Sequence, residues 1–187
     1  MKVVLINGTI IGSKTKTILQ EVESQLKQFS SIMEIEQVHL EQYTLEFADG
    51  RSKDQYSDET QSLINLIESA DGFIVATPIF QGSIPGVLKN LFDLISPKAM
   101  RYKPVALLAN GGTVQHHLVI ENQLKPILDY FRCLITPNYV YTHASHFSYT
   151  NELIDEDVKQ RIYELTRVFS HYVTMSQAVI EGDHLNL

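Results

Sequence analysis

Residues 70–93 read ADGFIVATPIFQGSIPGVLKNLFD and combine an apolar run, a loop rich in glycine and proline, and an amphipathic segment. The apolar run at residues 73–76 is typical of a strand that is buried on both faces of a sheet. In the loop, Gly82 and Gly86 allow the backbone to approach a flat ligand, and Pro85 suits the first turn of a helix. This stretch therefore predicts a strand, a candidate binding loop and a helix in direct succession.

The same alternation of strand and helix extends over the rest of the chain. Apolar, β-branched runs predict strands at residues 3–6, 32–40, 73–76, 105–109 and 134–141. Apolar positions at helical spacing predict helices within residues 18–29, 63–67, 87–95, 120–131 and 155–178. The first, third and fourth strands are almost wholly apolar, which indicates a parallel sheet covered by helices on both faces. We predict a doubly wound α/β fold, a single domain over residues 1–187 with five parallel strands in the order 2-1-3-4-5.

Two stretches depart from the regular pattern. Pro126 lies inside the fourth helical pattern and should kink that helix or divide it in two. Residues 43–57 show no clear period, and we expect a mobile loop that lies near the site or at a subunit contact. In this strand order the ligand crevice forms from the loops after strands 1, 3 and 4, so those three loops are the expected site.

The composition argues against several other classes of protein. The 187 residues have a formal net charge of −7, whereas nucleic acid and anionic membranes attract basic proteins. No stretch approaches the ~18 consecutive apolar residues of a membrane span. The single cysteine, Cys133, allows no intramolecular disulfide and no cysteine-based metal motif. We therefore expect a cytoplasmic protein in a reducing compartment, without nucleic acid, membrane or metal as a partner.

The other two expected site loops contain groups that suit a phosphate and a ring. Residues 7–16 read NGTIIGSKTK and offer hydroxyls and helix-start amides to an anion. They match neither G-x-x-x-x-G-K-[ST] nor G-x-G-x-x-G, so a glycine turn with a Ser or Thr helix cap explains them equally well. Residues 107–113 read LLANGGT, and the paired glycines would let main-chain N–H groups reach a ring edge. Taken alone, such a pair is more often only a turn.

The string at residues 70–93 resembles the NADPH-dependent FMN reductase family, which is flavodoxin-like and includes azobenzene-reductase-like members. That family has the pattern A-D-[GA]-[IFV]-[IV]-[IVL]-[AS]-[TS]-P-x-[YF]-x-x-S-x-x-G-x-L-K-N-x-[LF]-D, which the chain follows over more than twenty residues. The resemblance covers most of residues 1–135. It implies that the FMN-binding residues are Thr9, Ser13, Lys14 and Thr15 at the phosphate, Pro78, Ile79, Phe80, Gln81 and Ser83 at the isoalloxazine ring, and Gly111, Gly112 and Thr113 at its pyrimidine side.

The resemblance also implies an activity. A member of this family is an NAD(P)H-dependent flavin oxidoreductase, in which hydride passes from NADPH or NADH to FMN and electrons then pass to a flavin, quinone or azo acceptor. Because the flavin carries the chemistry, no catalytic side chain is named. The small-molecule acceptor is the expected partner, and a homodimer or homotetramer is implied. Two positions differ from many members: Ile11 stands in place of an arginine, and residues 79–81 stand in place of Glu-Tyr-Asn.

Two alternatives from other classes stay open. A flavodoxin-like electron carrier would use an acidic surface to dock a basic partner and would not oxidise NADPH by itself. A flavin-free α/β regulatory domain would be colourless and would not bind FMN. Within the chain, His116 and His117 are more typical of polar residues in a first helical turn than of ligands. Cys133 is more typical of a small core residue than of a nucleophile.

Overall fold

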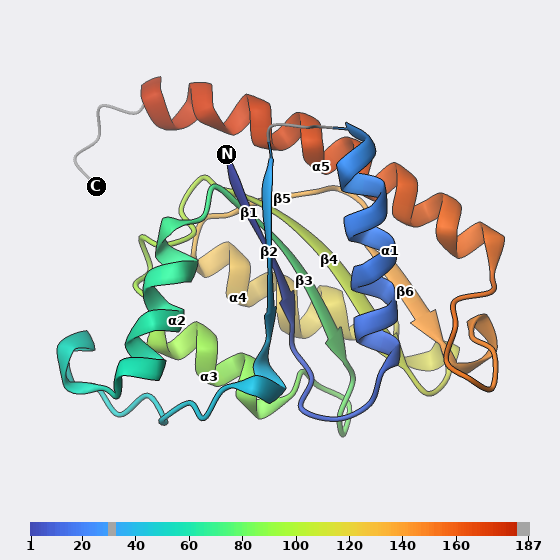
Figure 1. Cartoon of the computed structure of the whole chain (residues 1–187), viewed down its shortest axis with the longest axis horizontal. Helices are drawn as coiled ribbons and strands as arrows, with labels where there is room; N and C mark the ends of the chain where they lie inside the picture. Colours follow the sequence, from blue (N-terminus) through green and yellow to red (C-terminus); the bar gives the residue numbers. More distant parts are fainter. Residues whose placement is uncertain (30–32, 183–187) are drawn as a thin grey trace.

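The computed structural model describes residues 1–29 and 33–182. In this part of the chain, a central parallel sheet has helices on both sides (Figure 1). The strands are β1 (Lys2–Asn7), β2 (Glu34–His39), β3 (Gly72–Pro78), β4 (Pro104–Gly111), β5 (Leu134–Ile135) and β6 (Val140–His143). Their order is β2-β1-β3-β4-β5, with β6 also paired to β4, and every pairing is parallel. The predicted flavodoxin-like α/β fold and strand order are confirmed.

The fifth predicted strand is wrong in one respect, because residues 134–141 do not form one strand. β5 pairs with the beginning of β4, and β6 pairs with its end, so two short strands occupy one position in the sheet. Pro137 lies between them and has no N–H to donate to the ladder. The second predicted strand began at Ile32, which lies outside the described residues, and the observed strand ends one residue before Leu40.

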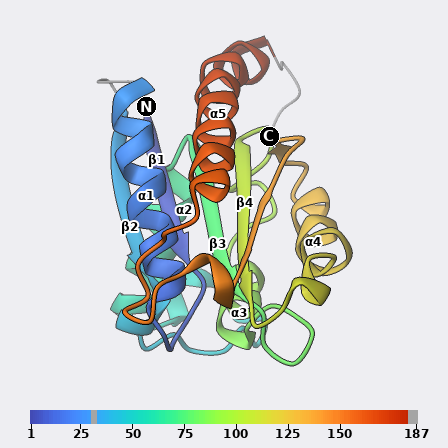
Figure 2. The same cartoon turned by 90° about the vertical axis from the view of Figure 1, so that its right-hand side faces the viewer.

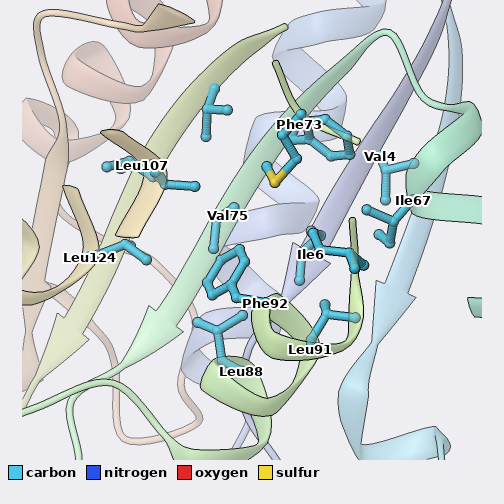
Figure 3. Packing of buried hydrophobic residues seen from close by; sticks show 14 of the residues in the cluster. Val4, Ile6, Ile67, Phe73, Val75, Leu88, Leu91, Phe92, Leu107 and Leu124 are labelled. Carbon is cyan, nitrogen blue, oxygen red and sulfur yellow. The ribbon is translucent and has the colours of Figure 1, made fainter. Parts of the chain in front are cut away.

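The helices form two layers, one on each face of the sheet. One layer contains α1 (Lys14–Phe29) and α5 (Glu156–Gly182), and the other contains α2 (Asp58–Ser69), α3 (Gly86–Leu94) and α4 (Lys125–Tyr130). Figure 2 shows α1 and α5 side by side, with α4 on the other side of the sheet. The layers form because successive strand residues point to opposite faces. Val3 and Leu5 therefore pack toward α1 and α5, while Val4 and Ile6 pack toward α2 and α3 (Figure 3).

Local chemistry explains where two of the helices begin. A π-helical turn, η4 (Ile120–Leu124), runs directly into α4, and Pro126 is the second residue of α4. The wider turn thus lies immediately before the proline, which has no N–H to donate. The predicted kink or division at Pro126 is seen only as a change from π-helical to α-helical geometry, and the backbone stays helical through it. The short helix predicted at residues 63–67 is longer, because Ser57 caps α2 by accepting a hydrogen bond from the Thr60 N–H at 3.4 Å.

Residues 43–57 form a connection that contains a short 3-10 helix, η2 (Lys53–Gln55), and is attached to α3. The Asn90 side chain accepts a hydrogen bond from the Ala48 N–H at 3.0 Å and donates one to the Glu46 carbonyl at 2.9 Å. None of the residues 43–57 lines the site cleft described below, and a subunit contact of this segment stays a prediction. Among the described residues, no helix has the length and apolar character that a bilayer crossing needs.

Candidate functional site

The three predicted loops meet at one edge of the sheet. β1, β3 and β4 run in the same direction, so their carboxyl ends lie together (Figure 1). A cleft of about 330 Å³ lies at this edge, within the range typical of small-molecule sites. The residues that line it are Ile11, Gly12, Ser13, Lys14, Thr15, Pro78, Ile79, Phe80, Asn110, Gly111, Gly112 and Asn151.

Thr9 shapes the first loop from inside. Its side chain is buried, and its hydroxyl donates a hydrogen bond to the Ile11 carbonyl at 2.5 Å. The same oxygen accepts a hydrogen bond from the Ile11 N–H at 3.1 Å. The Thr9 N–H in turn donates to the Asn7 side chain at 3.4 Å. Thr9 therefore holds the loop in a tight turn and does not line the cleft.

The amino end of α1 forms the polar wall of the cleft. Gly12 has a φ of +90°, a conformation that glycine adopts without strain, and it leads the chain into the helix. Ser13, Lys14 and Thr15 follow and line the cleft. The amides of a first helical turn have no intrahelical partner, and the helix dipole is positive at this end. This wall therefore suits an anion such as a phosphate.

The exit loop of β3 is a tight hairpin. Phe80 and Ser83 exchange two main-chain hydrogen bonds of 2.9 and 3.0 Å around a two-residue turn. The turn residues Gln81 and Gly82 have φ values of 49° and 76°, and two positive values are characteristic of a type I′ turn. Gln81 therefore forms the tip of the hairpin and does not line the cleft.

The two sides of this hairpin have different roles. Pro78, Ile79 and Phe80 line the cleft and give it an apolar wall. Ser83 points elsewhere, because its hydroxyl donates a hydrogen bond to the Gln123 side chain at 3.2 Å. The Ile79 N–H donates to the Asn110 carbonyl at 3.0 Å, which joins the second loop to the third.

The paired glycines of the third loop are not equivalent. A Cβ atom on Gly112 would meet no atom within 4 Å, so this residue faces open space in the cleft. A Cβ atom on Gly111 would lie 2.0 Å from the Tyr141 hydroxyl. That hydroxyl donates a hydrogen bond of 2.5 Å to the Thr113 carbonyl. Gly111 thus accommodates Tyr141, and Thr113 positions the loop from outside the cleft.

Asn151 is the site residue that sequence reasoning missed most completely. Its side-chain amide donates a hydrogen bond to the Ser13 hydroxyl at 3.0 Å, and its carbonyl accepts one from the Thr17 hydroxyl at 3.1 Å. Its φ of 63° is left-handed, which asparagine tolerates better than most residues. The only sequence signal is an asparagine in a polar stretch, which does not distinguish a binding residue from an ordinary turn.

Asn110 also lines the cleft, although sequence reasoning did not name it as a binding residue. It directly precedes Gly111, which the resemblance does assign to FMN binding. Its side-chain oxygen accepts a hydrogen bond from the Thr142 hydroxyl at 3.0 Å. The contact comes from β6, which the sequence did not separate from β5. Ile11 completes the lining of the first loop with an exposed apolar side chain.

Two histidines and the cysteine do not belong to this cleft. His116 and His117 are exposed, and a ring nitrogen of His117 lies 2.9 Å from the Val114 carbonyl. Burial raises the pKa of the Cys133 thiol to about 12, so the sulfur stays protonated and packs against the core. In the described ranges, no three His, Cys, Asp or Glu side chains are grouped as metal ligands.

Comparison with known proteins agrees with this arrangement of loops. The profile of the family described as NADPH-dependent FMN reductase matches residues 1–147. The chain belongs to the NADPH-dependent FMN reductase family. The reductase is 48% identical over 165 residues to the NAD(P)H-dependent FAD/FMN reductase of Geobacillus thermodenitrificans, covering 88% of this chain and 89% of that one. It is 35% identical over 162 residues to the FMN reductase (NADPH) of Pseudomonas aeruginosa, covering 86% of each chain.

A solved structure extends the likeness to the fold. An oxidoreductase from Corynebacterium diphtheriae has a TM-score of 0.77 and 19% identity to the reductase, covering 94% of this chain and 98% of that one.

Family membership makes the chain an oxidoreductase that uses NAD(P)H and FMN, and it does not support the electron-carrier alternative. Asn151 and α5 lie beyond the part of the reductase that the family profile matches.

The cleft of the reductase has the features that FMN requires. The start of α1 offers amides and hydroxyls for a phosphate, and Ile79 and Phe80 offer an apolar wall for a ring. Gly112 leaves open the space that a side chain would fill. When bound, FMN supplies the hydride and electron transfer, so the chain needs only to bind and orient it.

Proposed function

We propose that the cleft binds FMN with its phosphate at the first turn of α1 and its ring between the Ile79–Phe80 wall and Gly112. The observation that carries this proposal is the open space at Gly112, directly beside two loops that reach the same edge from other strands. The predicted residues then fall into two groups. Those expected to contact FMN are Ser13, Lys14, Thr15, Pro78, Ile79, Phe80, Gly111 and Gly112. Those expected to shape the loops are Thr9, Gln81, Ser83 and Thr113.

The protein contributes binding and electrostatics to the proposed reaction. Main-chain N–H groups at Gly111 and Gly112 would favour negative charge on the ring edge they face. Lys14 supports the phosphate end with a positive charge, and its ammonium lies 5.5 Å from the centre of the Phe147 ring. No side chain is assigned a proton transfer, because hydride transfer through a flavin does not require one.

We further propose the finer properties that the family suggests. The acceptor is a small molecule such as a flavin, a quinone or an azo compound, and the protein works in the cytoplasm as a single domain over residues 1–187. A homodimer or homotetramer is supported by a shallow apolar cavity between α3 and α4, where Tyr130 is 71% exposed.

The test of this function is steady-state oxidation of NADPH and of NADH by the purified protein. We expect consumption of at least one donor that depends on FMN and is increased by a quinone or an azo dye. A titration with FMN in the same preparation should show saturable binding. A protein that binds FMN but oxidises neither donor would be a carrier, and a protein that does not bind FMN would contradict the proposal.

Asn151 offers a specific test of where the phosphate lies. Asn151→Gly removes the amide that donates to Ser13 but keeps a residue that adopts the left-handed backbone, so the carbonyl bond from Thr17 can remain. A hydrogen bond of this kind contributes about 1 kcal/mol, so we expect roughly a fivefold weaker affinity for FMN. Fluorescence titration measures the dissociation constant.

Riboflavin, which has no phosphate, is the matched control ligand for this variant. Its affinity should be the same for Asn151→Gly and for the wild-type protein. An equal loss for FMN and riboflavin would mean that Asn151 acts on the ring or on the whole cleft. That result would contradict the placement of the phosphate at the start of α1.

A further inference from the structure

A second cavity of about 690 Å³ lies along the free edge of β6. We call it the β6 groove. Its walls come from the loop before β6, from β6 itself and the residues just after it, from the segment after the third site loop and from the first turns of α5. It therefore lies at the edge of the sheet where β6 is placed, beside the first turns of α5.

The β6 groove and the cleft share a wall. His143 lines the groove and is the register partner of Gly111, which lines the cleft. Tyr141 also lines the groove, and its hydroxyl donates to the carbonyl of Thr113 in the third site loop. A single elongated ligand could therefore place one end over the cleft and the other in the groove.

The charge of the β6 groove favours an anion. Arg161 lines it, and in the described ranges this side chain has neither an ion pair nor a hydrogen bond. Glu164 lines it too, but Arg167 neutralises this carboxylate at 2.9 Å. Lys159, on the same helix, is already paired with Glu156 at 2.7 Å. An unpaired guanidinium in a cavity is well suited to a phosphate.

Histidine and tyrosine side chains form the aromatic part of the β6 groove. The rings of His143 and His146 have centroids 4.0 Å apart. Burial lowers the pKa of His146, and His143 and Arg161 lower it further, whereas Asp155 raises it, so the neutral form of the ring is favoured. Tyr139 and Tyr141 supply aromatic rings on which a flat base can pack. The groove thus combines the positive charge of Arg161 with aromatic walls.

We propose that the β6 groove binds the adenosine-phosphate end of the nicotinamide dinucleotide while the nicotinamide reaches the FMN cleft. This inference rests on the proposed function of the cleft. A dinucleotide has a flat ring at each end and phosphates between them, which matches two adjoining hollows with a cation in the second. Arg161 binds the phosphates, and the tyrosines contact the adenine.

Arg161→Gln tests the proposal, with Lys159→Gln as the matched control. Both variants lose one positive charge from α5, but Lys159 does not line the groove. Loss of a charge-assisted bond should raise KM for NADPH roughly tenfold, and kcat should stay constant because donor binding alone is weakened. The affinity for FMN should not change. The control should keep the wild-type KM, and an equal effect in both variants would overturn the proposal.

Direct titration with ADP separates this inference from the function of the cleft. ADP should bind the wild-type protein with or without FMN, should bind Arg161→Gln at least tenfold more weakly, and should compete with NADPH. Binding of FMN without binding of ADP would overturn the groove assignment alone. Failure to bind FMN would overturn the function of the cleft, while the ADP titration still reports on the groove. A sulfonated aromatic acceptor that binds the groove in place of ADP would also overturn the assignment.

Discussion

Gly112→Val is expected to lower the affinity for FMN while leaving the fold intact. The new side chain would enter the space where the ring is proposed to lie, because a Cβ atom at this position meets no protein atom within 4 Å. Overpacking of a filled site costs about 1–3 kcal/mol, so at the upper end we expect roughly a 100-fold weaker dissociation constant. The backbone of Gly112 is not in the left-handed region, so valine adds no strain there.

The measurement for Gly112→Val is FMN titration together with a thermal melt. The melting temperature should stay close to that of the wild-type protein in the absence of FMN. Gly112→Ala serves as a graded control, because one methyl group should weaken binding less than an isopropyl group does. An unchanged FMN affinity in Gly112→Val would show that the cleft is not the flavin site.

Gly111→Ala, one residue earlier, should reduce the stability of the fold, which Gly112→Val is expected to leave unchanged. Its Cβ atom would lie 2.0 Å from the Tyr141 hydroxyl and 3.0 Å from the Cζ atom of that ring. The ring must then move and give up its hydrogen bond to the Thr113 carbonyl. We expect a loss of about 2–3 kcal/mol, which lowers the melting temperature by roughly 5–10 °C for a domain of this size.

A double-mutant cycle with Tyr141→Phe identifies the cause of that loss. Removal of the hydroxyl takes away the closest atom, so Gly111→Ala should cost less in the Tyr141→Phe background than in the wild type. The relief should be partial, because the ring carbon remains close. Denaturant unfolding of the four proteins gives the coupling energy. A cost that is equal in both backgrounds would contradict the contact with Tyr141.

Much of the fold follows from local patterns in the chain. The apolar runs at β1, β3 and β4 are buried on both faces, and such runs occur in parallel sheets covered by two layers of helix. The crossover rules then leave few strand orders, and the common one is observed. Pro126 marks the place where the π-helical turn gives way to α4, so a single residue type suffices to predict an irregularity in this helix.

Other features depend on contacts between residues that are far apart in the chain. The resemblance places Gln81 and Ser83 with their neighbours at the ring, but the hairpin turns them away from the cleft. Asn151 reaches Ser13 from 138 positions further along the chain, so no local pattern could reveal the contact. The split of the last strand likewise depends on where Pro137 lies relative to β4.

Local sequence patterns suffice to predict a parallel sheet with three candidate loops at one edge, because apolar periodicity and the positions of glycine and proline act over a few residues. Which loop residues face the cleft and which hold the loops in place depends on the folded chain. Gly111 and Gly112 are chemically identical, yet one accommodates Tyr141 and the other opens into the cleft. The physical reason is that packing against distant segments sets which way each residue faces. Local sequence patterns carry no information about those distant contacts.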